Sequence, residues 1–327
     1  MKAMRTKSSD RKISRRSFLS ASIVLGAGIF SYPAMSAFAR VQSLSRNTFP
    51  DIGLALGSGG ANGLAHIPVL ETLDELKIKP KVISGTSIGA IIGVLYASGH
   101  SGLELRKMAL DLFAPDESLF GSWWDRLTGA GLSGLLSPGL GDGVLLDATG
   151  IMEFIQKKIR VKYFEDLDIP VKVVAADFWR KKQVVFSSGE IIPALNASMA
   201  VPGLFAPVEF QGRLLVDGAV VNPVPYDLLL NECDFLVAVD VSGVKKRDNE
   251  GRPSYLDSIF STFEIMQQAI MDEKLRQRTP DIYLRPEITD VRLINFLEVQ
   301  NILEQTEPAK IQLEALLREM LEIHAEK

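Results

Sequence analysis

The chain has 327 residues, of which 46% are hydrophobic and 23% charged, a composition that predicts a folded protein and excludes the disordered and collagen-like classes. Residues 1–39 hold seven Lys or Arg and one Asp, so the remaining residues carry 29 basic against 39 acidic side chains, a formal charge of −10. Nucleic acid is therefore not an expected partner, because phosphate binding needs a basic surface. A membrane contact would have to be peripheral and apolar, since a polybasic patch is equally unsupported.

The first 39 residues have the features of an export signal. Arg15 and Arg16 precede an apolar run from Phe18 to Phe30, and Ala37-Phe38-Ala39 offers a small-residue cleavage site. This order is typical of a twin-arginine signal peptide. The run has 13 residues, whereas a helix needs ~20 to span a bilayer. We expect the twin-arginine machinery to export the protein to the periplasm or beyond, with cleavage; the alternative is an uncut anchor that keeps it at the membrane.

A polar linker at residues 40–50 leads into apolar segments that alternate with glycine turns and helical patterns. Segments 52–57 and 80–85 each run into a glycine-containing turn and a helix, which is typical of a parallel α/β sheet. Pro68 is expected either to lie in the first turn of the earlier helix or to kink it. The segments 171–178 and 183–188 are separated by four residues, which predicts a hairpin and therefore a mixed sheet. Further strands are expected at 213–218, 235–240 and 281–286.

Two segments depart from this alternation. Residues 115–143 are rich in glycine and serine yet carry large apolar side chains such as Trp123 and Trp124. They form either a mobile flap over a site or a small helical excursion packed on the core, and packing is the favoured interpretation. Residues 307–327 carry a stripe of Leu and Ile opposite a charged face, which predicts an amphipathic surface helix.

The motif Gly85-Thr86-Ser87-Ile88-Gly89 places a serine between an apolar strand and a helix. A nucleophile on such a sharp turn has its hydroxyl exposed at the carboxyl end of the sheet, and glycines flank it because side chains would clash with the neighbouring strand and helix. The N-terminus of the helix favours developing negative charge there. Ser87 is therefore a candidate nucleophile, and the alternative is a plain tight turn.

Residues 57–63, GSGGANG, follow the first strand and are a candidate oxyanion site. Gly59 and Gly60 allow successive backbone N–H groups to face one side and form a nest for an anion. A dinucleotide site fits poorly, because Asn62 breaks the glycine pattern and the strand at 80–85 does not end in an acidic residue. A Walker lysine is absent, so no phosphate cofactor is expected. The lone Cys233 is expected to be a small buried side chain, and zinc-ligand spacing is absent, so no metal is expected.

The proton acceptor for Ser87 is the open question. The histidines are His66 in a helix, His100 in a turn and His324 near the C-terminus, and only His324 fits the order of residues in α/β-hydrolases. A desolvated carboxylate can replace imidazole as a base. Asp217 ends an apolar strand before a glycine turn, which places it at the same sheet edge as Ser87 or makes it a simple turn residue.

Four ordered motifs resemble the patatin-like phospholipases, particularly bacterial members near the neuropathy target esterase catalytic domain. They are GLALGSGGANGLAH, ISGTSIGAIIG, NASMAVPGLFAPV and LLVDGAVVNPVP, and the resemblance covers roughly residues 50–290. It implies a three-layer α/β/α fold with a central, mostly parallel but mixed sheet, and a Ser–Asp dyad that hydrolyses acyl esters of lipids without a metal or cofactor.

The resemblance also assigns roles to single residues. It makes Ser87 the nucleophile and Asp217 the general base and acid, and it places the oxyanion loop at residues 58–63, with donors at Gly59, Gly60 and Ala61. The motif glycines are Gly57, Gly63, Gly85, Gly89 and Gly218. Two positions depart from the family pattern: Ser58 replaces the first glycine of the loop, and Asn62 replaces the usual basic residue. The second change bears on which head group the substrate carries.

The expected domain organisation is a signal peptide at residues 1–39, a linker at 40–50, a hydrolase domain at 51–290 and a helical extension at 291–327 packed on the same domain. The expected function is that of an exported serine hydrolase acting on lipid carboxylic esters. Two alternatives remain. One is a periplasmic lipid-binding or partner-binding protein that keeps the fold without useful catalysis. The other is an enzyme that transfers the acyl group to another acceptor or takes it from a thioester.

Overall fold

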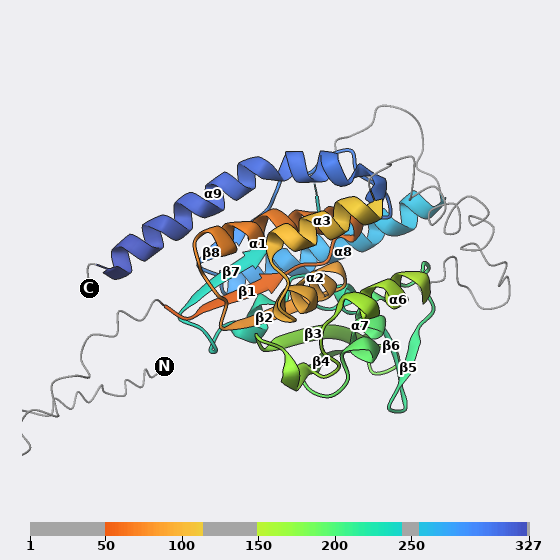
Figure 1. Cartoon of the computed structure of the whole chain (residues 1–327). Coiled ribbons are helices and arrows are strands. Elements are labelled where there is room, and N and C mark those ends of the chain that lie inside the picture. The colour runs from red at the N-terminus through yellow and green to blue at the C-terminus, as the bar shows by residue number, and fades with distance from the viewer. Residues whose placement is uncertain (1–49, 114–148, 244–254, 326–327) are drawn as a thin grey trace, which may run out of the picture. The chain divides into compact units, whose positions relative to one another are not determined.

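A central eight-stranded sheet organises the computed structural model, which describes residues 50–113, 149–243 and 255–325 (Figure 1). The strand order is β5-β6-β3-β2-β1-β7-β8, and β4 also pairs with β3. The strands are β1 Ile52–Leu56, β2 Val82–Thr86, β3 Val171–Asp177, β4 Lys182–Phe186, β5 Val208–Phe210, β6 Arg213–Asp217, β7 Phe235–Val239 and β8 Ile282–Leu284. The predicted leader, the first ten residues of the linker from 40 to 49, and the segment 115–143 lie outside the described residues.

The sheet is mixed but mostly parallel. Strands β3, β2, β1, β7 and β8 run parallel to one another, whereas β4 and β6 are antiparallel to β3, and β5 is antiparallel to β6. The carboxyl ends of β1, β2 and β7 therefore meet at one edge, which we call the carboxyl edge. Residues that follow these strands are brought together there although they are far apart in the sequence.

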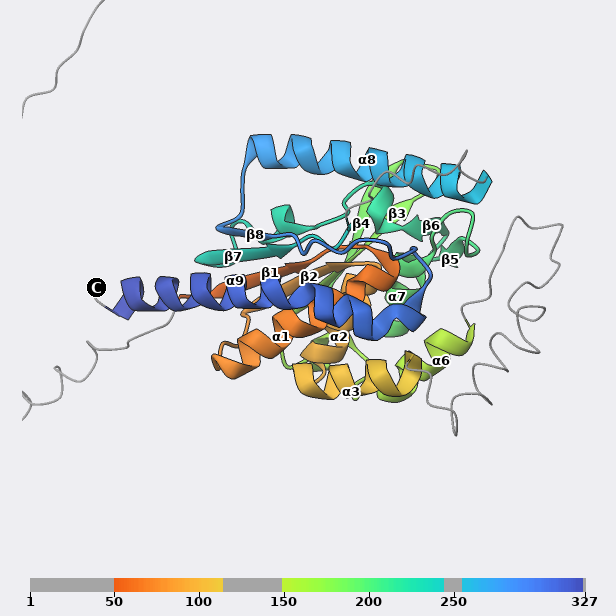
Figure 2. The same ribbon diagram turned by 90° about the horizontal axis from the view of Figure 1, so that it is seen from above.

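Helices cover both faces of the sheet, as Figure 2 shows. One long helix, α8, lies over one face, and α1, α2, α3, α7 and α9 lie over the other, which makes the three-layer arrangement that the sequence predicts. The helices are α1 His66–Glu75, α2 Ile88–Ala97, α3 Gly102–Phe113, α6 Thr149–Lys158, α7 Ile191–Met199, α8 Tyr255–Gln277 and α9 Val299–Ala325.

Strand β1 shows why the central strands are apolar along their whole length. Leu54 and Leu56 pack into the larger core beneath α1, α2 and α9, whereas Ala55 joins Leu236 and Met271 in the smaller core beneath α8. A strand covered on both faces has no solvent side, so its sequence does not alternate between apolar and polar residues.

Most of the expected elements are present, with ends shifted by a few residues. The hairpin of β3 and β4 is antiparallel as predicted, and Pro68 occupies the third position of α1. The C-terminal helix differs from the expectation, because it begins at Val299 and contains Pro308 within it. Its residues Leu313 and Leu317 are fully buried in the same core as α1. No helix in the described part of the chain is both long and apolar enough to traverse a bilayer.

Candidate active site

Ser87 occupies the single position between the end of β2 and the start of α2. Its backbone has φ 57° and ψ −125°, a conformation that non-glycine residues rarely adopt. Its backbone N–H donates to Ser198 Oγ at 2.9 Å, and its carbonyl accepts the N–H of Ala90 at 3.0 Å. Such strain persists only where surrounding contacts hold it, and it is common at functional residues.

The two flanking glycines are required by close packing. A Cβ at Gly85 would lie 2.6 Å from Ala90 Cα, and a Cβ at Gly89 would lie 2.3 Å from Leu56 O. Both neighbours are backbone atoms, which cannot swing away as a flexible side chain can. The G-x-S-x-G pattern is therefore a steric requirement of this turn, as expected from the sequence.

Asp217 lies at the end of β6 and faces Ser87 across the sheet edge. It is 2% exposed, and its Oδ1 accepts the N–H of Ala219 at 2.8 Å. Burial raises the pKa of Asp217 to about 7, and hydrogen bonds from Ala219 N–H and the Ser87 side chain oppose the rise. A carboxylate with a pKa near neutrality that is hydrogen-bonded to a serine hydroxyl has the properties of a general base.

Register explains how two residues so far apart in sequence meet. Thr86 is opposite Val174 in the β2–β3 pair, and Ala175 is opposite Asp217 in the β3–β6 pair. The end of β6 is thus level with the turn that follows β2. Gly218 allows the chain to pass closely over β3, because a Cβ there would lie 2.4 Å from Val174 O.

The glycine-rich loop after β1 is tied down at three of its backbone N–H groups. Gly57 donates to Val239 O at 2.9 Å, Ser58 donates to Pro223 O at 2.9 Å, and Ala61 donates to Leu293 O at 2.8 Å. Ala61 was expected to be an oxyanion donor, and this assignment is wrong in the structure because its N–H is already used. Across the described residues, the N–H groups of Gly59 and Gly60 have no such backbone acceptor.

Gly60 and Gly63 shape this loop. Gly60 has φ +56°, which favours glycine, and a Cβ on it would lie 2.2 Å from Leu293 O. A Cβ on Gly63 would lie 2.2 Å from Ile88 Cγ2, so Gly63 lets the loop approach the residue that follows Ser87. A Cβ on Gly57, the remaining motif glycine of this loop, would lie 2.8 Å from Val239 O.

Within the described part of the chain, each of the three histidines is hydrogen-bonded to a backbone carbonyl of a residue other than Ser87. His66 is fully buried, and its Nε2 contacts Gly57 O at 2.8 Å, so it supports the glycine-rich loop. Burial lowers the pKa of His66 to about 4, which keeps the ring neutral at physiological pH. His100 Nε2 contacts Lys158 O at 2.8 Å, and His324 Nδ1 contacts Met320 O at 2.9 Å.

Ser198 is a residue of the site that the sequence analysis did not single out. Its hydroxyl oxygen accepts the Ser87 N–H and its O–H donates to Val174 O at 2.6 Å, so it bridges α7, β3 and the serine turn. It is fully buried. Ser198 lies in the third motif, NASMAVPGLFAPV, and that membership is the signal that could have identified it.

A cavity of about 950 Å³ opens over Ser87 and Asp217. Gly59 and Gly60 also line it, and apolar side chains of α2, α3 and α6 form much of its wall, among them Ile91, Leu95, Met108, Phe113, Phe154 and Ile155. Its size and its lining suit a hydrocarbon chain. Three buried polar atoms that border it have no partner within the described residues: Ser58 Oγ, Asn62 Oδ1 and Ser242 Oγ. No group of three or more His, Cys, Asp or Glu that could hold a metal ion is found in that part of the chain.

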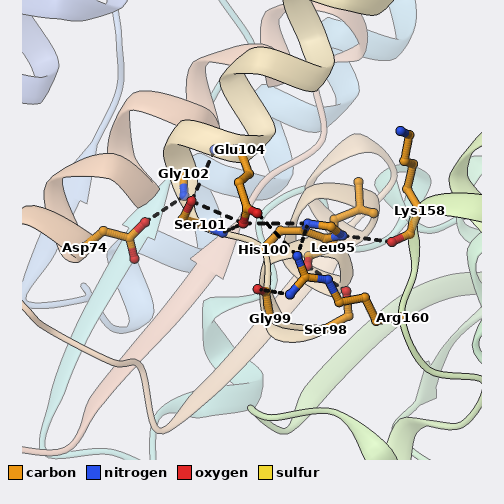
Figure 3. A network of polar contacts seen from close by, with 10 residues as sticks. All are labelled: Asp74, Leu95, Ser98, Gly99, His100, Ser101, Gly102, Glu104, Lys158 and Arg160. Carbon is orange, nitrogen blue, oxygen red and sulfur yellow. Dashed lines mark hydrogen bonds and ion pairs between the residues drawn. The ribbon is translucent and has the colours of Figure 1, made fainter.

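Two of the cavity helices are anchored at the opposite edge of the sheet by the polar network in Figure 3. His100 contacts Lys158 O at the end of α6, and its Nδ1 lies 3.2 Å from Arg160 Nη2. Arg160 also donates to Gly99 O at 2.7 Å, and the start of α3 is held by Gly102 N–H donating to Asp74 at 2.6 Å. The network fixes α3 and α6 relative to the core, and so fixes two cavity walls.

A comparison with protein families identifies the group to which this site belongs. A family model described as patatin-like phospholipase matches residues 54–230, more than half of the chain, and the match includes Ser87, Asp217 and the glycine-rich loop. The chain belongs to the patatin-like phospholipase family. Its three-layer architecture and mixed sheet are therefore the family fold, as the four sequence motifs predict.

Curated relatives of this patatin-like phospholipase fall within the neuropathy target esterase branch. An uncharacterized NTE family protein of Mycobacterium tuberculosis is 35% identical over 195 residues, which are 59% of this chain and 50% of the relative. Lysophospholipase NTE1 of Kluyveromyces lactis is 33% identical over 212 residues, 64% of this chain and 14% of that protein. Human patatin-like phospholipase domain-containing protein 6 is 29% identical over 227 residues, 68% of this chain and 15% of that protein.

The chain thus spans half the length of the mycobacterial relative and a small part of the eukaryotic ones. Among solved structures, VipD from Legionella pneumophila aligns with a TM-score of 0.44 at 14% identity, over 80% of this chain and 66% of that chain. The type III effector ExoU aligns with a TM-score of 0.43 at 16% identity, over 84% of this chain and 54% of that chain.

Proposed function

We propose that this protein is an exported serine hydrolase that cleaves carboxylic ester bonds of lipids with a Ser87–Asp217 dyad. One observation carries the proposal. A strained serine is hydrogen-bonded to a buried carboxyl group with a pKa of about 7, at the base of a cavity of about 950 Å³ with apolar walls. Membership of the patatin-like phospholipase family supports the same chemistry.

In the acylation step, Asp217 accepts the proton of the Ser87 hydroxyl as Oγ attacks the acyl carbonyl carbon. The carbonyl oxygen becomes negatively charged, and the N–H groups of Gly59 and Gly60 stabilise it, because they have no other backbone acceptor in the described part of the chain. The start of α2 adds a favourable dipole. Asp217 then gives its proton to the leaving alcohol, and the acyl group stays on Ser87.

In the deacylation step, water takes the place of the alcohol. Asp217, again ionised, accepts a proton from water as the water oxygen attacks the acyl carbonyl, and the proton is returned to Ser87 Oγ as the fatty acid leaves. A base with a pKa near 7 suits both steps, because it is basic enough to accept the serine proton and acidic enough to release it to the alcohol.

The proposed substrate is a lipid with an aliphatic acyl chain. The walls of α2, α3 and α6 would hold the chain, and the unpartnered polar atoms of Ser58, Asn62 and Ser242 would face the polar part of the substrate. Asn62 is uncharged where the family usually carries a basic residue, which favours a neutral, hydroxylated group near the loop over a phosphate.

The proposed site of action is outside the cytoplasm. The paired Arg15 and Arg16, the short apolar run and the Ala-Phe-Ala sequence support export by the twin-arginine machinery, which carries folded proteins. The acyl hydrolase would then meet lipids of the cell envelope.

The proposal is tested by comparing wild type with Ser87→Ala and Asp217→Asn in hydrolysis of a short-chain nitrophenyl ester. Each variant should lose at least ~10³-fold in kcat while remaining folded, because each lacks one member of the dyad. Ser84→Ala is the matched control for the serine. Ser84 lies in β2, the strand that ends just before Ser87, is buried and donates to Pro225 O, and its loss should leave kcat within about threefold of wild type. Labelling by a fluorophosphonate should modify Ser87 in the wild type.

Three results would contradict the proposal. Full activity in Asp217→Asn with loss in His324→Ala would indicate a conventional triad. No fluorophosphonate labelling of the folded protein, together with stable lipid binding, would indicate a binding protein. Acyl transfer to an added alcohol or release from a thioester faster than ester hydrolysis would indicate an acyltransferase or a thioesterase.

A further inference from the structure

The turn between β3 and β4 exposes two aromatic side chains to solvent. Trp179 is 74% exposed and Phe178 is 45% exposed, and their rings meet edge to face with centroids 4.9 Å apart. Single exposed apolar residues are common on protein surfaces, but an adjacent exposed pair of large aromatics is more typical of an interaction site.

This turn has a defined structure rather than a loose one. The Asp177 carboxylate accepts the backbone N–H of Arg180 at 2.8 Å and a guanidinium N–H of the same residue at 3.0 Å. Lys181 N–H donates to Asp177 O at 2.8 Å, and Phe178 N–H donates to Leu214 O at 2.9 Å. Lys181 adopts φ +54°, which closes the turn. These bonds hold the backbone so that the two aromatic side chains project outward.

The turn projects from the same edge of the sheet as the candidate active site. Ala175 of β3 is level with Asp217, and Trp179 follows four residues later along the chain. Strand β3 continues two residues past this level to Asp177, roughly 7 Å at ~3.3 Å per residue, and the turn that carries Trp179 follows it. Ile294 and Leu297, which are 50% and 42% exposed, follow β8 at this edge, and Leu293 O is bonded to the glycine-rich loop. These exposed apolar side chains and the cavity thus lie at the same carboxyl edge of the sheet.

Three cations follow the aromatic pair directly. Arg180, Lys181 and Lys182 are all exposed, and Asp177 forms an ion pair with Arg180 at 3.0 Å. The formal charge of −10 outside the leader does not exclude such a local cluster of positive charge. Tryptophan beside lysine or arginine is the residue combination found at lipid–water interfaces, where the ring enters the head-group layer and the cations meet anionic lipids.

We propose that residues 178–182, the interfacial turn, dock this protein onto an anionic lipid surface with the mouth of the cavity facing the lipid. The purpose of the docking rests on the proposed lipid hydrolysis, but the binding itself needs no catalysis. A lipid surface is favoured over a protein partner because rigid aromatics, adjacent cations and a lipid-sized apolar cavity share one edge of the sheet. A short turn of this size also offers too little area for a stable protein interface, which buries about 800 Å² per partner.

The test uses the Ser87→Ala protein, so that vesicles are not consumed, and measures flotation with vesicles of phosphatidylcholine alone or with one-third phosphatidylglycerol. Binding should be stronger to the anionic vesicles. Lys181→Glu/Lys182→Glu should bind these at least about 25-fold more weakly, since each cation near an anionic surface contributes roughly fivefold. Trp179→Ser should weaken binding to both vesicle types about tenfold, because buried apolar area sets that part of the affinity.

Matched controls lie elsewhere on the surface. Lys79→Glu changes an exposed lysine just before β2, at the opposite edge of the sheet, and Ile311→Ser changes a 61% exposed residue of α9. Both should bind vesicles as the parent protein does. With Ser87 restored, the turn variants should hydrolyse a soluble short-chain ester at the wild-type rate and lose activity only on vesicles, which also shows that they are folded.

Unchanged vesicle binding in the turn variants would overturn the docking proposal, as would equal losses in the control variants. A concentration-dependent dimer that the turn variants abolish would assign the turn to contact between two copies and would also overturn it. Vesicle binding through the turn by a protein that hydrolyses no ester would leave the docking intact and reject the proposed hydrolase. Hydrolysis of soluble esters without vesicle binding would support the proposed hydrolase and reject the docking.

Discussion

Ser198 determines whether the Ser87 backbone is held in its strained conformation. Its hydroxyl satisfies the Ser87 N–H and is itself fixed by Val174 O. Ser198→Ala should cost about 1–3 kcal/mol of unfolding free energy, because a buried N–H loses its acceptor. It should also lower kcat about tenfold or more with little change in KM, because the nucleophile is misplaced rather than the substrate.

Denaturant unfolding and steady-state kinetics check this prediction. Ser84→Ala is the appropriate comparison, since it removes an equally buried hydroxyl whose partner, Pro225 O, does not hold the nucleophile. If Ser198→Ala and Ser84→Ala showed the same kcat, the Ser198 hydroxyl would have a purely structural role.

Asp217 makes the stability of the protein depend on pH in an unusual direction. Its pKa is raised from 3.8 to about 7 by burial, so between these values the folded state binds more protons than the unfolded state. This contribution is fully present below pH 3.8 and is lost as pH rises through about 7, by roughly 4 kcal/mol at most. Asp217→Asn should therefore be more stable than wild type at pH 8 and similar to it at pH 4.

Urea unfolding at both pH values measures this difference. Asp177 provides a control of opposite sign, because the backbone N–H of Arg180 and its guanidinium lower the pKa of Asp177. The contribution of the Asp177 carboxylate is lost only as pH falls below 3.8, so Asp177→Asn should cost nearly the same stability at pH 8 and at pH 4. A pH-independent effect of Asp217→Asn would mean that the folded protein does not raise the pKa of this carboxyl.

The residues of the site were predictable to the extent that they carry a local signal. Gly85, Ser87 and Gly89 lie in one turn, and the five-residue G-x-S-x-G motif is enough to predict its steric requirements. Asp217 needed the family motifs, because nothing near it in the sequence shows that β6 lies beside β3. The use of the Ala61 N–H by Leu293 O could not be foreseen, since the two residues are far apart in the sequence and meet only in the fold.

At the scale of elements, α3 and α6 connect the cavity with the network around His100. His100→Ala removes the donor to Lys158 O at the end of α6. We expect a loss of about 1 kcal/mol in unfolding free energy, since one half-buried carbonyl is left without its partner. Phe154 and Ile155 of α6 line the cavity, so kcat/KM should fall more for long-chain than for short-chain esters.

A chain-length series of nitrophenyl esters measures this difference directly. Lys157→Ala, an exposed residue of the same helix, should leave both stability and chain-length preference unchanged. An equal loss for all chain lengths in His100→Ala would indicate that α6 does not form part of the acyl site.

Elements with a strong local pattern were predictable, and those stabilised by tertiary contacts were not. The apolar strands and the β3–β4 hairpin follow from periodicity and spacing. Strand β5 has only three residues, too few for a pattern. Helix α8 is held partly by the half-buried Lys274, whose ammonium donates to Asn222 Oδ1 at 2.5 Å and Val224 O at 2.6 Å. No local sequence pattern reveals these contacts.

For the whole molecule, the proposed export signal would decide where the proposed acyl hydrolase meets its substrate. Arg15→Lys/Arg16→Lys should keep the protein in the cytoplasm, because the twin-arginine machinery requires the arginine pair. Cell fractionation followed by immunoblotting measures this, and Arg5→Lys/Arg11→Lys is the control with the same charge. Export of both variants would contradict the proposed route. Retention of the wild type and both variants in the cytoplasm would also contradict it.

The account as a whole depends on Asp217 acting as the base for Ser87, and the pH dependence of fluorophosphonate labelling tests this most directly. The second-order labelling rate of the wild type should rise about tenfold per pH unit below a pKa of about 7 and level off above it, because only the ionised carboxylate accepts the serine proton. Asp217→Asn should be labelled at least ~10³-fold more slowly at every pH. Labelling of Asp217→Asn at the wild-type rate, with the same pH profile, would contradict the dyad.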